Sequence, residues 1–420
     1  MARFAFYGDD FTGSVDALLQ FRRTGLDGVL VTSPEALARA GDADVVGIAG
    51  IARSLPTAEL ESEVGPAFEA LLALQPAVLQ YKACSTADSS PEVGSLGRVI
   101  EIGRALVGTA PVPVLLAQPD FGRYTTFSHH FAADRGEVYR LDRQPTMANH
   151  PVTPATESDL RRHLAAQTTL RVEGIHWPGY ADEATLAAAL APTRDDVDVL
   201  VLDALTDAHL SQVSTTFRPP NPLSTTFRPP TRFMLGSGGL TRALGLGVGA
   251  PALDGGRNVV ESGVVVLSGS ASALTWRQVQ AAVAAGFDAV DLFDDGGTEQ
   301  VVDLASRGRP VIAYSARPDS PRTATSAEIE ERLAAIGTTT LQRRPDTRLV
   351  VCGGDTSGNV LRRLGVDSLR IVSNPWGIVS LCRAEGTAEH LRGGIEIALK
   401  GGQMGHENLF DDIRSGTPLP

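Results

Sequence analysis

Short apolar runs alternate along the chain with longer stretches of helical periodicity. In the first half, stretches such as 57–74 and 92–106 show one apolar face, as amphipathic helices do. Continuous apolar strands separated by helices are typical of a parallel sheet that helices cover on both faces. The pattern therefore predicts an α/β domain over residues 1–245. Its strands are expected at 3–8, 28–32, 44–49, 77–81, 113–117, 197–202 and 232–237.

A glycine-rich segment interrupts this pattern. Residues 246–262 have no steady hydrophobic period and predict an interdomain linker. Strand–loop–helix units return over residues 263–420, which predict a second, smaller α/β domain. Each domain is expected to hold a mainly parallel sheet flanked by helices, with the active site in the cleft between the domains. The second set of strands is expected at 264–268, 287–292, 310–314, 348–352 and 395–400.

Two segments carry local structural signals. Thr325 and Glu328 have the spacing of a capping box, and Gly337 is expected just beyond the C-terminus of the helix that they open. The sequence STTFRPP occurs twice, at 214–220 and at 224–230. Because its proline pairs exclude a regular helix, the repeat predicts a surface loop that grew by local duplication.

Composition limits the classes of partner. The 420 residues carry a formal net charge of -12, which argues against nucleic acid or an anionic membrane surface as a partner. The cysteines Cys84, Cys352 and Cys382 are far apart, which fits a reducing cytosol, and no histidine pair has the spacing of zinc ligands. A cytoplasmic protein without a signal peptide, membrane span or structural metal is expected. The oligomeric state is left open.

Two strand-to-helix turns contain acidic residues. Residues 8–14 read GDDFTGS and residues 353–358 read GGDTSG, and each turn follows an apolar run and precedes a helical pattern. Ligands of open α/β sheets bind at the carboxyl ends of strands, where such turns lie. The structural alternative is that Asp10 and Asp355 only cap their helices.

The chemistry of the two turns predicts two kinds of site. Asp9 and Asp10 would repel a phosphate but accept hydrogen bonds from hydroxyl groups, so the first turn, with Thr12, predicts a polyol site. Backbone amides of the second turn can hold phosphate oxygens, and Asp355 can hold Mg²⁺ or accept a proton from an attacking hydroxyl. The candidates in the second turn are Gly353, Gly354, Asp355 and Thr356.

Four further loops add candidates. Lys82 follows a strand and precedes several hydroxyls, as a site for a sugar-acid carboxylate requires, and residues 235–240 form an amide-rich turn. The loop 268–272, SGSAS, suits close approach to a nucleotide, and Lys400 with its neighbouring glycines suits a phosphate clamp. The candidates are Lys82, Ser85, Thr86, Asp88, Ser237 and Gly238 for the acid, and Ser268, Ser270, Lys400, Gly401 and Gly402 for the nucleotide.

These pieces occur in one order over nearly the whole chain. They are DDFTGS (9–14), YKACSTADSS (81–90), HPVTPATESDLRRHLAAQT (150–168), DALTDAHL (203–210), GSGGL (236–240), SGSASALTWRQV (268–279), GGDTSGNVLRRLGV (353–366) and LKGGQMG (399–405). The ordered set resembles the four-carbon acid sugar kinases.

The resemblance implies a reaction and a division of labour. The first domain would bind the sugar acid and the second would bind ATP with Mg²⁺, and a hydroxyl of a four-carbon or branched acid would be phosphorylated. Ala87, Ala271 and the final loop KGGQMG depart from the family pattern, so the acid itself stays open.

Two other functions compete with a kinase. A non-catalytic sugar-acid sensor could keep the same two domains, although it would not need the glycines and the acid of GGDTSG. A dehydrogenase requires a dinucleotide fingerprint, whereas the first turn here is acidic.

Overall fold

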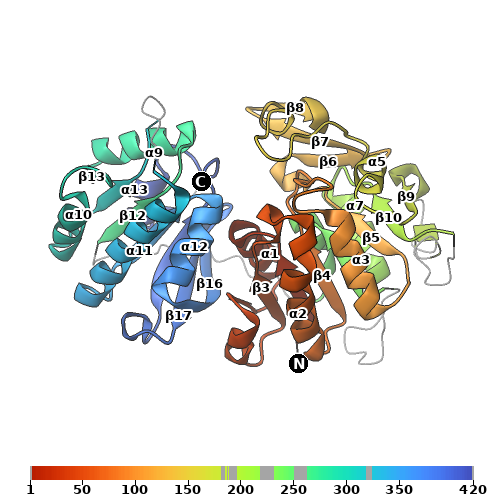
Figure 1. Ribbon diagram of the computed structural model, residues 1–420, viewed down its shortest axis with the longest axis horizontal. Coiled ribbons are helices and arrows are strands. Elements are labelled where there is room, and N and C mark those ends of the chain that lie inside the picture. Colours follow the sequence, from red (N-terminus) through yellow and green to blue (C-terminus); the bar gives the residue numbers. More distant parts are fainter. Residues whose placement is uncertain are drawn as a thin grey trace. The chain divides into compact units, whose positions relative to one another are not determined.

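The computed structural model describes most of the chain and divides it into two compact units (Figure 1). Both units are α/β, which confirms the predicted fold class. The described residues are 2–180, 185–186, 188, 196–217, 231–249, 263–317 and 324–418, without the side chain of Asp355. The first unit comprises Met1–Gly28, Ser33–Glu35 and Ala40–Ala252, and the second comprises Val29–Thr32, Ala36–Arg39 and Leu253–Pro420.

The first unit contains a fully parallel run of strands. Its spatial order is β3 (Val45–Ala49), β1 (Phe4–Gly8), β4 (Val78–Lys82), β11 (Phe233–Gly236), β5 (Val112–Leu115), β10 (Val199–Leu202) and β9 (Val172–Ile175). The apolar runs predicted these strands, except for the half-exposed β9 at the edge. The longer helices are α1 (Phe11–Arg23), α2 (Leu60–Ala73), α3 (Leu96–Val107), α7 (Asp207–Phe217) and α8 (Gly238–Gly245).

Alternating strand residues attach helices to opposite faces of this sheet. Phe6 of β1 packs against Phe21 of α1, whereas its neighbour Tyr7 packs edge-on against Phe68 of α2. Tyr81 of β4 stacks on Tyr7 on the same side. The period of two therefore places α1 and α2 on different faces, as a doubly covered parallel sheet requires.

A small antiparallel sheet accompanies the first unit. It consists of β6 (Arg123–Thr126), β7 (His129–Asp134) and β8 (Glu137–Arg140). The apolar pattern did not predict it, because its strands are short and partly exposed.

The repeat region was predicted wrongly at its start. Ser214–Phe217 continue α7 rather than forming a loop, because the first proline comes only at position 219. The rest of the repeat, 218–230, and residues 250–262 of the predicted linker lie outside the described residues.

The second unit contains five parallel strands followed by an antiparallel part. The parallel order is β13 (Asp288–Asp291), β14 (Val311–Tyr314), β12 (Val264–Ser268), β15 (Arg348–Cys352) and β18 (Ile395–Lys400). The antiparallel strands β17 (Val379–Gly386) and β16 (Val366–Trp376) were not predicted, and β2 (Gly28–Val31), from early in the chain, pairs with β16.

Helices cover both faces of this sheet. Val264 and Val266 belong to the core formed with α9 (Ala273–Ala284) and α13 (Leu409–Ser415). The next residue, Leu267, faces α11 (Ser326–Arg343), which packs between α10 (Gly297–Ser306) and α12 (Gly354–Leu364). No helix among the described residues is both long and apolar enough to cross a membrane.

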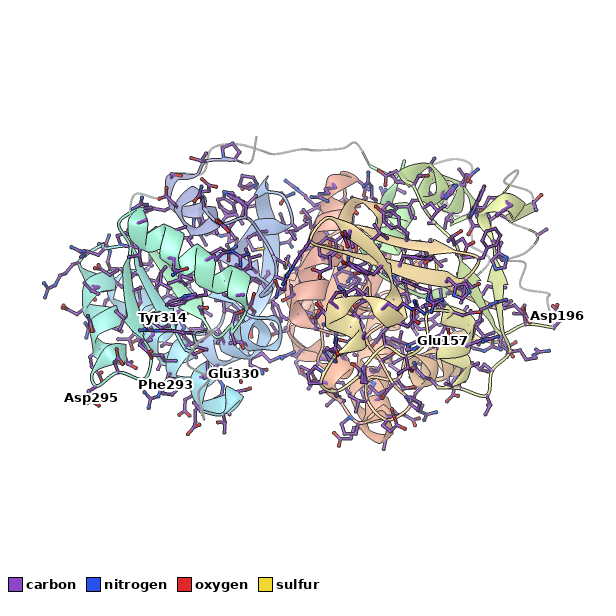
Figure 2. The ribbon with its side chains drawn as sticks, turned by 90° about the horizontal axis from the view of Figure 1, so that it is seen from above. Glu157, Asp196, Phe293, Asp295, Tyr314 and Glu330 are labelled. Atoms are coloured by element: carbon purple, nitrogen blue, oxygen red, sulfur yellow. The ribbon has the colours of Figure 1, made fainter. Side chains whose placement is uncertain are left out.

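Helix α11 begins as predicted but ends later. The capping box of Thr325 and Glu328 is present. Gly337 lies inside the helix and not just beyond its C-terminus, because the helix continues to Arg343. A Cβ at Gly337 would lie 3.1 Å from a methyl of Leu364, so this glycine permits close packing against α12. The buried Glu330, labelled in Figure 2, accepts a hydrogen bond from Asn359 of α12.

Candidate functional site

Strand register gathers the predicted residues of the first unit at one edge of its sheet. Gly8 of β1 pairs with Ala49 of β3 and with Lys82 of β4, and Lys82 pairs with Gly236 of β11. The loops that follow these strands, and the loop after β5, therefore meet at their carboxyl ends. We call this group of loops the first loop cluster.

Asp9 and Asp10 share one arginine. The Nη2 of Arg53 lies 3.0 Å from Asp9 Oδ1 and 2.8 Å from Asp10 Oδ2. The backbone N–H of Cys84 also donates to Asp9, over 3.0 Å. The two acids are thus not left as an unbalanced negative pair, because a guanidinium bridges them.

Burial and charge act against each other at this group. Burial raises the pKa of Asp10, although the charge of Arg53 opposes that change. Burial alone would lower the pKa of Arg53, but the carboxylates of Asp10 and Asp9 raise it well above its ordinary value. Asp10 also caps α1, since its side chain accepts a hydrogen bond from Gly13 N. Asp10 therefore does cap its helix, as the structural alternative predicted, but the capping bond uses only one of the two carboxylate oxygens.

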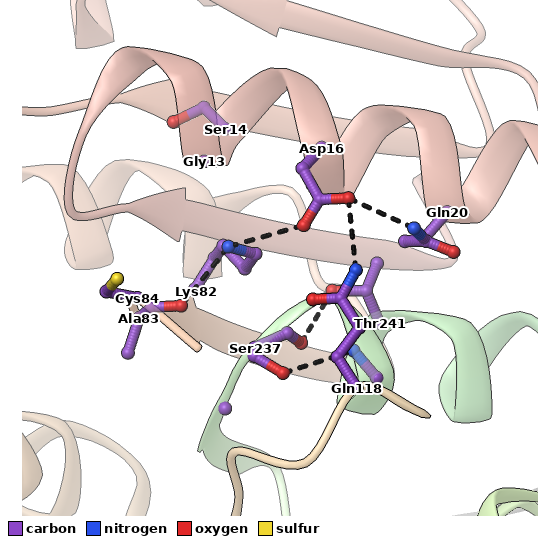
Figure 3. A network of polar contacts seen from close by, with 12 residues as sticks. Gly13, Ser14, Asp16, Gln20, Lys82, Ala83, Cys84, Gln118, Ser237 and Thr241 are labelled. Carbon is purple, nitrogen blue, oxygen red and sulfur yellow. Dashed lines mark hydrogen bonds and ion pairs between the residues drawn. The ribbon is translucent and has the colours of Figure 1, made fainter. Parts of the chain in front are cut away.

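Lys82 forms a second charged group with a residue that the sequence did not single out. Its Nζ lies 3.6 Å from Asp16 Oδ2 and donates to the carbonyl oxygen of Ala83 over 3.1 Å. Gln118, after β5, donates to Asp16 over 3.4 Å (Figure 3). Only 4% of the Lys82 side chain is exposed, so these neighbours offset the cost of burying its ammonium group.

Two glycines let the backbone approach these charged groups. A Cβ at Gly13 would lie 2.5 Å from Asp10 Oδ1 and 3.2 Å from Lys82 Nζ, so the two predicted residues meet at the start of α1. A Cβ at Gly238 would lie 2.5 Å from Asp16 Oδ2 and 2.8 Å from the Gln118 amide. The turn 236–239 is therefore built directly against the ion pair of Lys82.

The remaining candidates of the first unit differ in what they offer. Thr12 Oγ1 is buried and has no hydrogen-bond partner among the described residues, so this hydroxyl is available to donate to a ligand and to accept from one. Ser237 is fully buried and caps α8 through Gly239 N, so its hydroxyl is used internally. The carboxylate of Asp88 accepts a hydrogen bond from the hydroxyl of Thr153.

Residues 84–86 form a fixed loop beside Lys82. The thiol of Cys84 lies 3.1 Å from Thr86 Oγ1. The carbonyl oxygen of Ser85 lies 2.7 Å from His130 Nε2 on β7, and His130 is fully buried. Burial lowers the pKa of His130 to about 4, so this histidine is neutral at physiological pH and donates a hydrogen bond without adding charge.

Strand register also gathers the candidates of the second unit. Ser268 of β12 pairs with Cys352 of β15 and with Tyr314 of β14, and Cys352 pairs with Lys400 of β18. The loops after these four strands therefore lie at one edge. We call this group the second loop cluster.

Lys400 supports the second loop cluster from inside. Its ammonium is fully buried and donates to Thr275 Oγ1 over 2.8 Å and to the carbonyl oxygen of Gly402 over 3.5 Å. Thr275 Oγ1 lies 3.2 Å from Ser270 Oγ. Burial lowers the pKa of Lys400, and no carboxylate pairs with it within the described ranges. The loops after β12 and β18 are thus tied together around a cation.

The start of α12 presents free backbone amides. Gly353 is the N-cap, with φ of 132°, and none of the described side chains caps the helix. The first intrahelical bond is donated by Ser357 N, so the amides of Gly354, Asp355 and Thr356 precede it. A Cβ at Gly354 would have nothing within 4 Å. Asp355 is the second residue of the helix and not its cap; its side chain lies outside the described part of the structure.

Thr356 closes the gap between two glycine turns. A Cβ at Gly269 would lie 2.5 Å from its Cγ2, and a Cβ at Gly353 would lie 3.0 Å from its Cβ. Ser272 Oγ, at the N-cap of α9, is buried and has no hydrogen-bond partner among the described residues. This arrangement of small residues, amides and spare hydroxyls suits phosphate oxygens.

A cationic and aromatic group borders the second loop cluster. The rings of Trp276 and Tyr314 have centroids 5.3 Å apart, and the guanidinium of Arg317 lies over both. Tyr314, labelled in Figure 2, ends β14 next to Ser268. The sequence did not single out this group; its only signal was the position of Tyr314 at the end of a strand.

Two family models match successive parts of the chain. Residues 4–244 match the family described as sugar-binding N-terminal domain, and residues 265–410 match the family described as nucleotide-binding C-terminal domain. The chain is 38% identical to a 3-oxo-isoapionate kinase of Paraburkholderia graminis, over 98% of this chain and 94% of that protein. It is 30% identical to a 3-oxo-tetronate kinase of Cupriavidus necator, over 96% and 94%.

Solved structures share the fold. A protein from Haemophilus influenzae superposes with a TM-score of 0.75 at 20% identity, covering 97% of this chain and 98% of that one. With matches over both units and nearly the full length, the chain belongs to the four-carbon acid sugar kinase family.

Proposed function

We propose that the protein is an ATP-dependent kinase that phosphorylates a hydroxyl of a small sugar acid. The observation that carries the proposal is the pair of loop clusters, one with paired carboxylates and cations and the other with free amides and spare hydroxyls. Residues 1–245 would supply the acid-binding domain and 263–420 the nucleotide-binding domain. The names of the relatives support a four-carbon or branched acid as the acceptor.

The sugar acid would bind at the first loop cluster. The carboxylate oxygens of Asp9 and Asp10 can accept further hydrogen bonds, and would accept them from the hydroxyls of the sugar acid. Lys82 would donate a hydrogen bond to the sugar acid. Thr12 supplies the unused hydroxyl. The other proposed contacts are Ser85, Thr86 and Asp88 of the loop after β4, and Ser237 and Gly238 of the turn before α8.

ATP would bind at the second loop cluster. The start of α12, with Gly353, Gly354 and Thr356, would hold phosphate oxygens, and Ser268, Ser270, Gly401 and Gly402 would line the approach, with Lys400 keeping their loops in place. The described oxygens there are hydroxyls and carbonyls. They suit a Mg²⁺ that arrives bound to the phosphates, rather than one that protein carboxylates hold by themselves. Asp355 would be its protein ligand or the proton acceptor.

Transfer requires the acceptor hydroxyl and the terminal phosphate to be brought in line, with water excluded. We propose that this happens when the two domains close on each other around both substrates. The protein then needs to supply position, charge neutralisation and an acceptor for the hydroxyl proton, for which Asp355 is proposed. The cytoplasm, which supplies ATP, is the proposed compartment.

The deciding experiment is an ADP-release assay over a panel of acceptors. Tetronates, 3-oxo-tetronates and 3-oxo-isoapionate are each added to the protein with ATP and Mg²⁺, and the expected result is release of ADP with at least one acid well above the rate without acceptor. Calorimetric binding of an acid without any ADP release would instead support the sensor.

Replacing Gly238 by alanine should raise the KM for the sugar acid by about 5- to 100-fold, which corresponds to the usual cost of overpacking. The new methyl would meet the carboxylate of Asp16 and the amide of Gln118, and would displace the partners of Lys82. The kcat should change less, because the disturbed contacts act in the ground state and transition state alike. Steady-state kinetics with each substrate varied in turn measure the effect.

Two glycines serve as controls. Gly65→Ala, in α2, adds a methyl with nothing within 4 Å and should leave both KM values unchanged. Gly402→Ala adds a methyl 2.9 Å from Ser270 Oγ and should raise the KM for ATP instead. An increase in the KM for ATP alone with Gly238→Ala would contradict the assignment of the first loop cluster to the acid.

A further inference from the structure

Arg123 lies beside the first loop cluster at the start of β6. Its backbone is bonded to Gln118 in both directions, over 2.9 and 3.1 Å, and the side chain of Gln118 bonds to Asp16. In the neighbouring strand, His130 connects β7 to the carbonyl oxygen of Ser85. The paired strands β6 and β7 are thus each bonded to a loop of the proposed acid site, β6 through Arg123 and β7 through His130.

The guanidinium of Arg123 is held in place but is not neutralised. Its Nη1 donates to the carbonyl oxygens of Phe121, Gly122 and Ala133, over 3.1, 3.3 and 3.2 Å. Its Nε is buried and has no hydrogen-bond partner among the described residues. No carboxylate forms an ion pair with Arg123 in the part of the chain that the structure describes. One edge of the guanidinium is therefore fixed, and the other is unused.

This arginine differs from the other two cations of the cluster. Arg53 is paired with Asp9 and Asp10, and Lys82 is paired with Asp16. Burial lowers the pKa of Arg123, and nearby Cys84, Asp134 and Tyr124 oppose this effect. Cys84 also lies near Arg53. Arg123 is a partly buried cation that gains from an external anion.

We propose that Arg123 binds the carboxylate of the sugar acid through its Nε–Nη2 edge. A guanidinium edge matches a carboxylate with two parallel hydrogen bonds, which a lysine cannot provide. Lys82, already paired with Asp16, then serves a hydroxyl of the acid rather than its carboxylate. The inference rests on the proposed function and assigns the group that selects acids over neutral polyols.

The test compares Arg123→Gln with the wild-type enzyme on the most active acid of the panel and on its methyl ester. With the acid, the KM should rise by about 10- to 100-fold, the usual effect of losing a charged hydrogen bond, with little change in kcat. With the ester, both enzymes should have the same KM, which a merely structural role of Arg123 would not produce. Arg135→Gln, an exposed arginine in the β7–β8 turn, is the matched control and should behave as wild type.

The outcomes separate the inference from the proposed function. An unchanged KM for the acid in a folded Arg123→Gln variant, or an equal rise for acid and ester, overturns the inference alone. If none of the acids stimulates ADP release by the wild-type protein, the proposed function fails. Calorimetric titration of the wild-type and Arg123→Gln proteins with threonate and erythronate then tests the inference on its own. Equal binding by the two proteins, or no binding by either, overturns the inference.

A second measurement applies if Arg123→Gln does not fold. Cys84 is partly exposed, whereas Cys352 and Cys382 are buried, so iodoacetamide should alkylate Cys84 first in the native wild-type protein. The acid should protect Cys84 from alkylation, and its methyl ester should protect it much less. Equal protection by both, or no protection, overturns the inference.

Discussion

Replacing Asp355 by asparagine should lower kcat by about two to four decades, the range expected for a lost proton acceptor. Asparagine keeps the size and much of the hydrogen bonding of aspartate but cannot accept the hydroxyl proton. Asp355 is the second residue of α12, among the amides proposed to hold the phosphates. Since an acid in the first turn of a helix contributes only about 0.3–1 kcal/mol, the variant should stay folded.

The measurement combines turnover with nucleotide binding. Rates are determined by ADP release at saturating acid, and the Kd for ADP without Mg²⁺ should match that of the wild type. Asp303→Asn, which removes an exposed carboxylate from α10, is the control and should keep the full rate. Wild-type turnover by a folded, ADP-binding Asp355→Asn would limit Asp355 to stabilising the start of the helix.

Much of the parallel core followed from the apolar runs, because a strand that is buried on both faces reads as a continuous run. The antiparallel strands β16 and β17 were missed for the opposite reason. Residues of β16 such as Asp367 and Arg370 are partly exposed and interrupt the apolar run. Similarly, the sequence predicted the strand at 28–32 but contained no signal that Leu30 and Val31 would pair with β16.

The missed site residues depend on contacts that are distant in sequence. Arg53 follows β3 and reaches Asp9 only because β1 and β3 are neighbours in the sheet. Gln118 follows β5 in the same way. Both residues could have been chosen as candidates from the sequence, because they follow predicted strands and ligand-binding side chains gather at such positions. Asp16 lies three residues after Gly13, on the same face of the predicted helix. That spacing could have identified Asp16 as a neighbour of the turn.

Replacing Arg53 by methionine should lower the free energy of unfolding by about 3–5 kcal/mol, as expected when one partner of a buried ion pair is removed. The Asp9 and Asp10 side chains are only 2% and 7% exposed and would be left as neighbouring negative charges. Methionine keeps most of the apolar volume of the arginine stem, so the loss reports mainly on charge. Urea unfolding measures it, with hydrogen exchange of β1 amides reporting on the first unit separately.

Two comparisons identify charge as the cause. Adding Asp9→Asn to Arg53→Met should restore part of the lost stability, because only one buried carboxylate then remains. A lower pH should also stabilise the Arg53→Met variant. Burial already raises the pKa of Asp10, and without Arg53 the folded state is expected to bind more protons than the unfolded state. Stability must then increase as the pH falls, so the deficit of Arg53→Met relative to wild type should shrink between about pH 7.5 and about pH 5.5. A deficit that is independent of pH and unaffected by Asp9→Asn would show that Arg53 acts through packing alone.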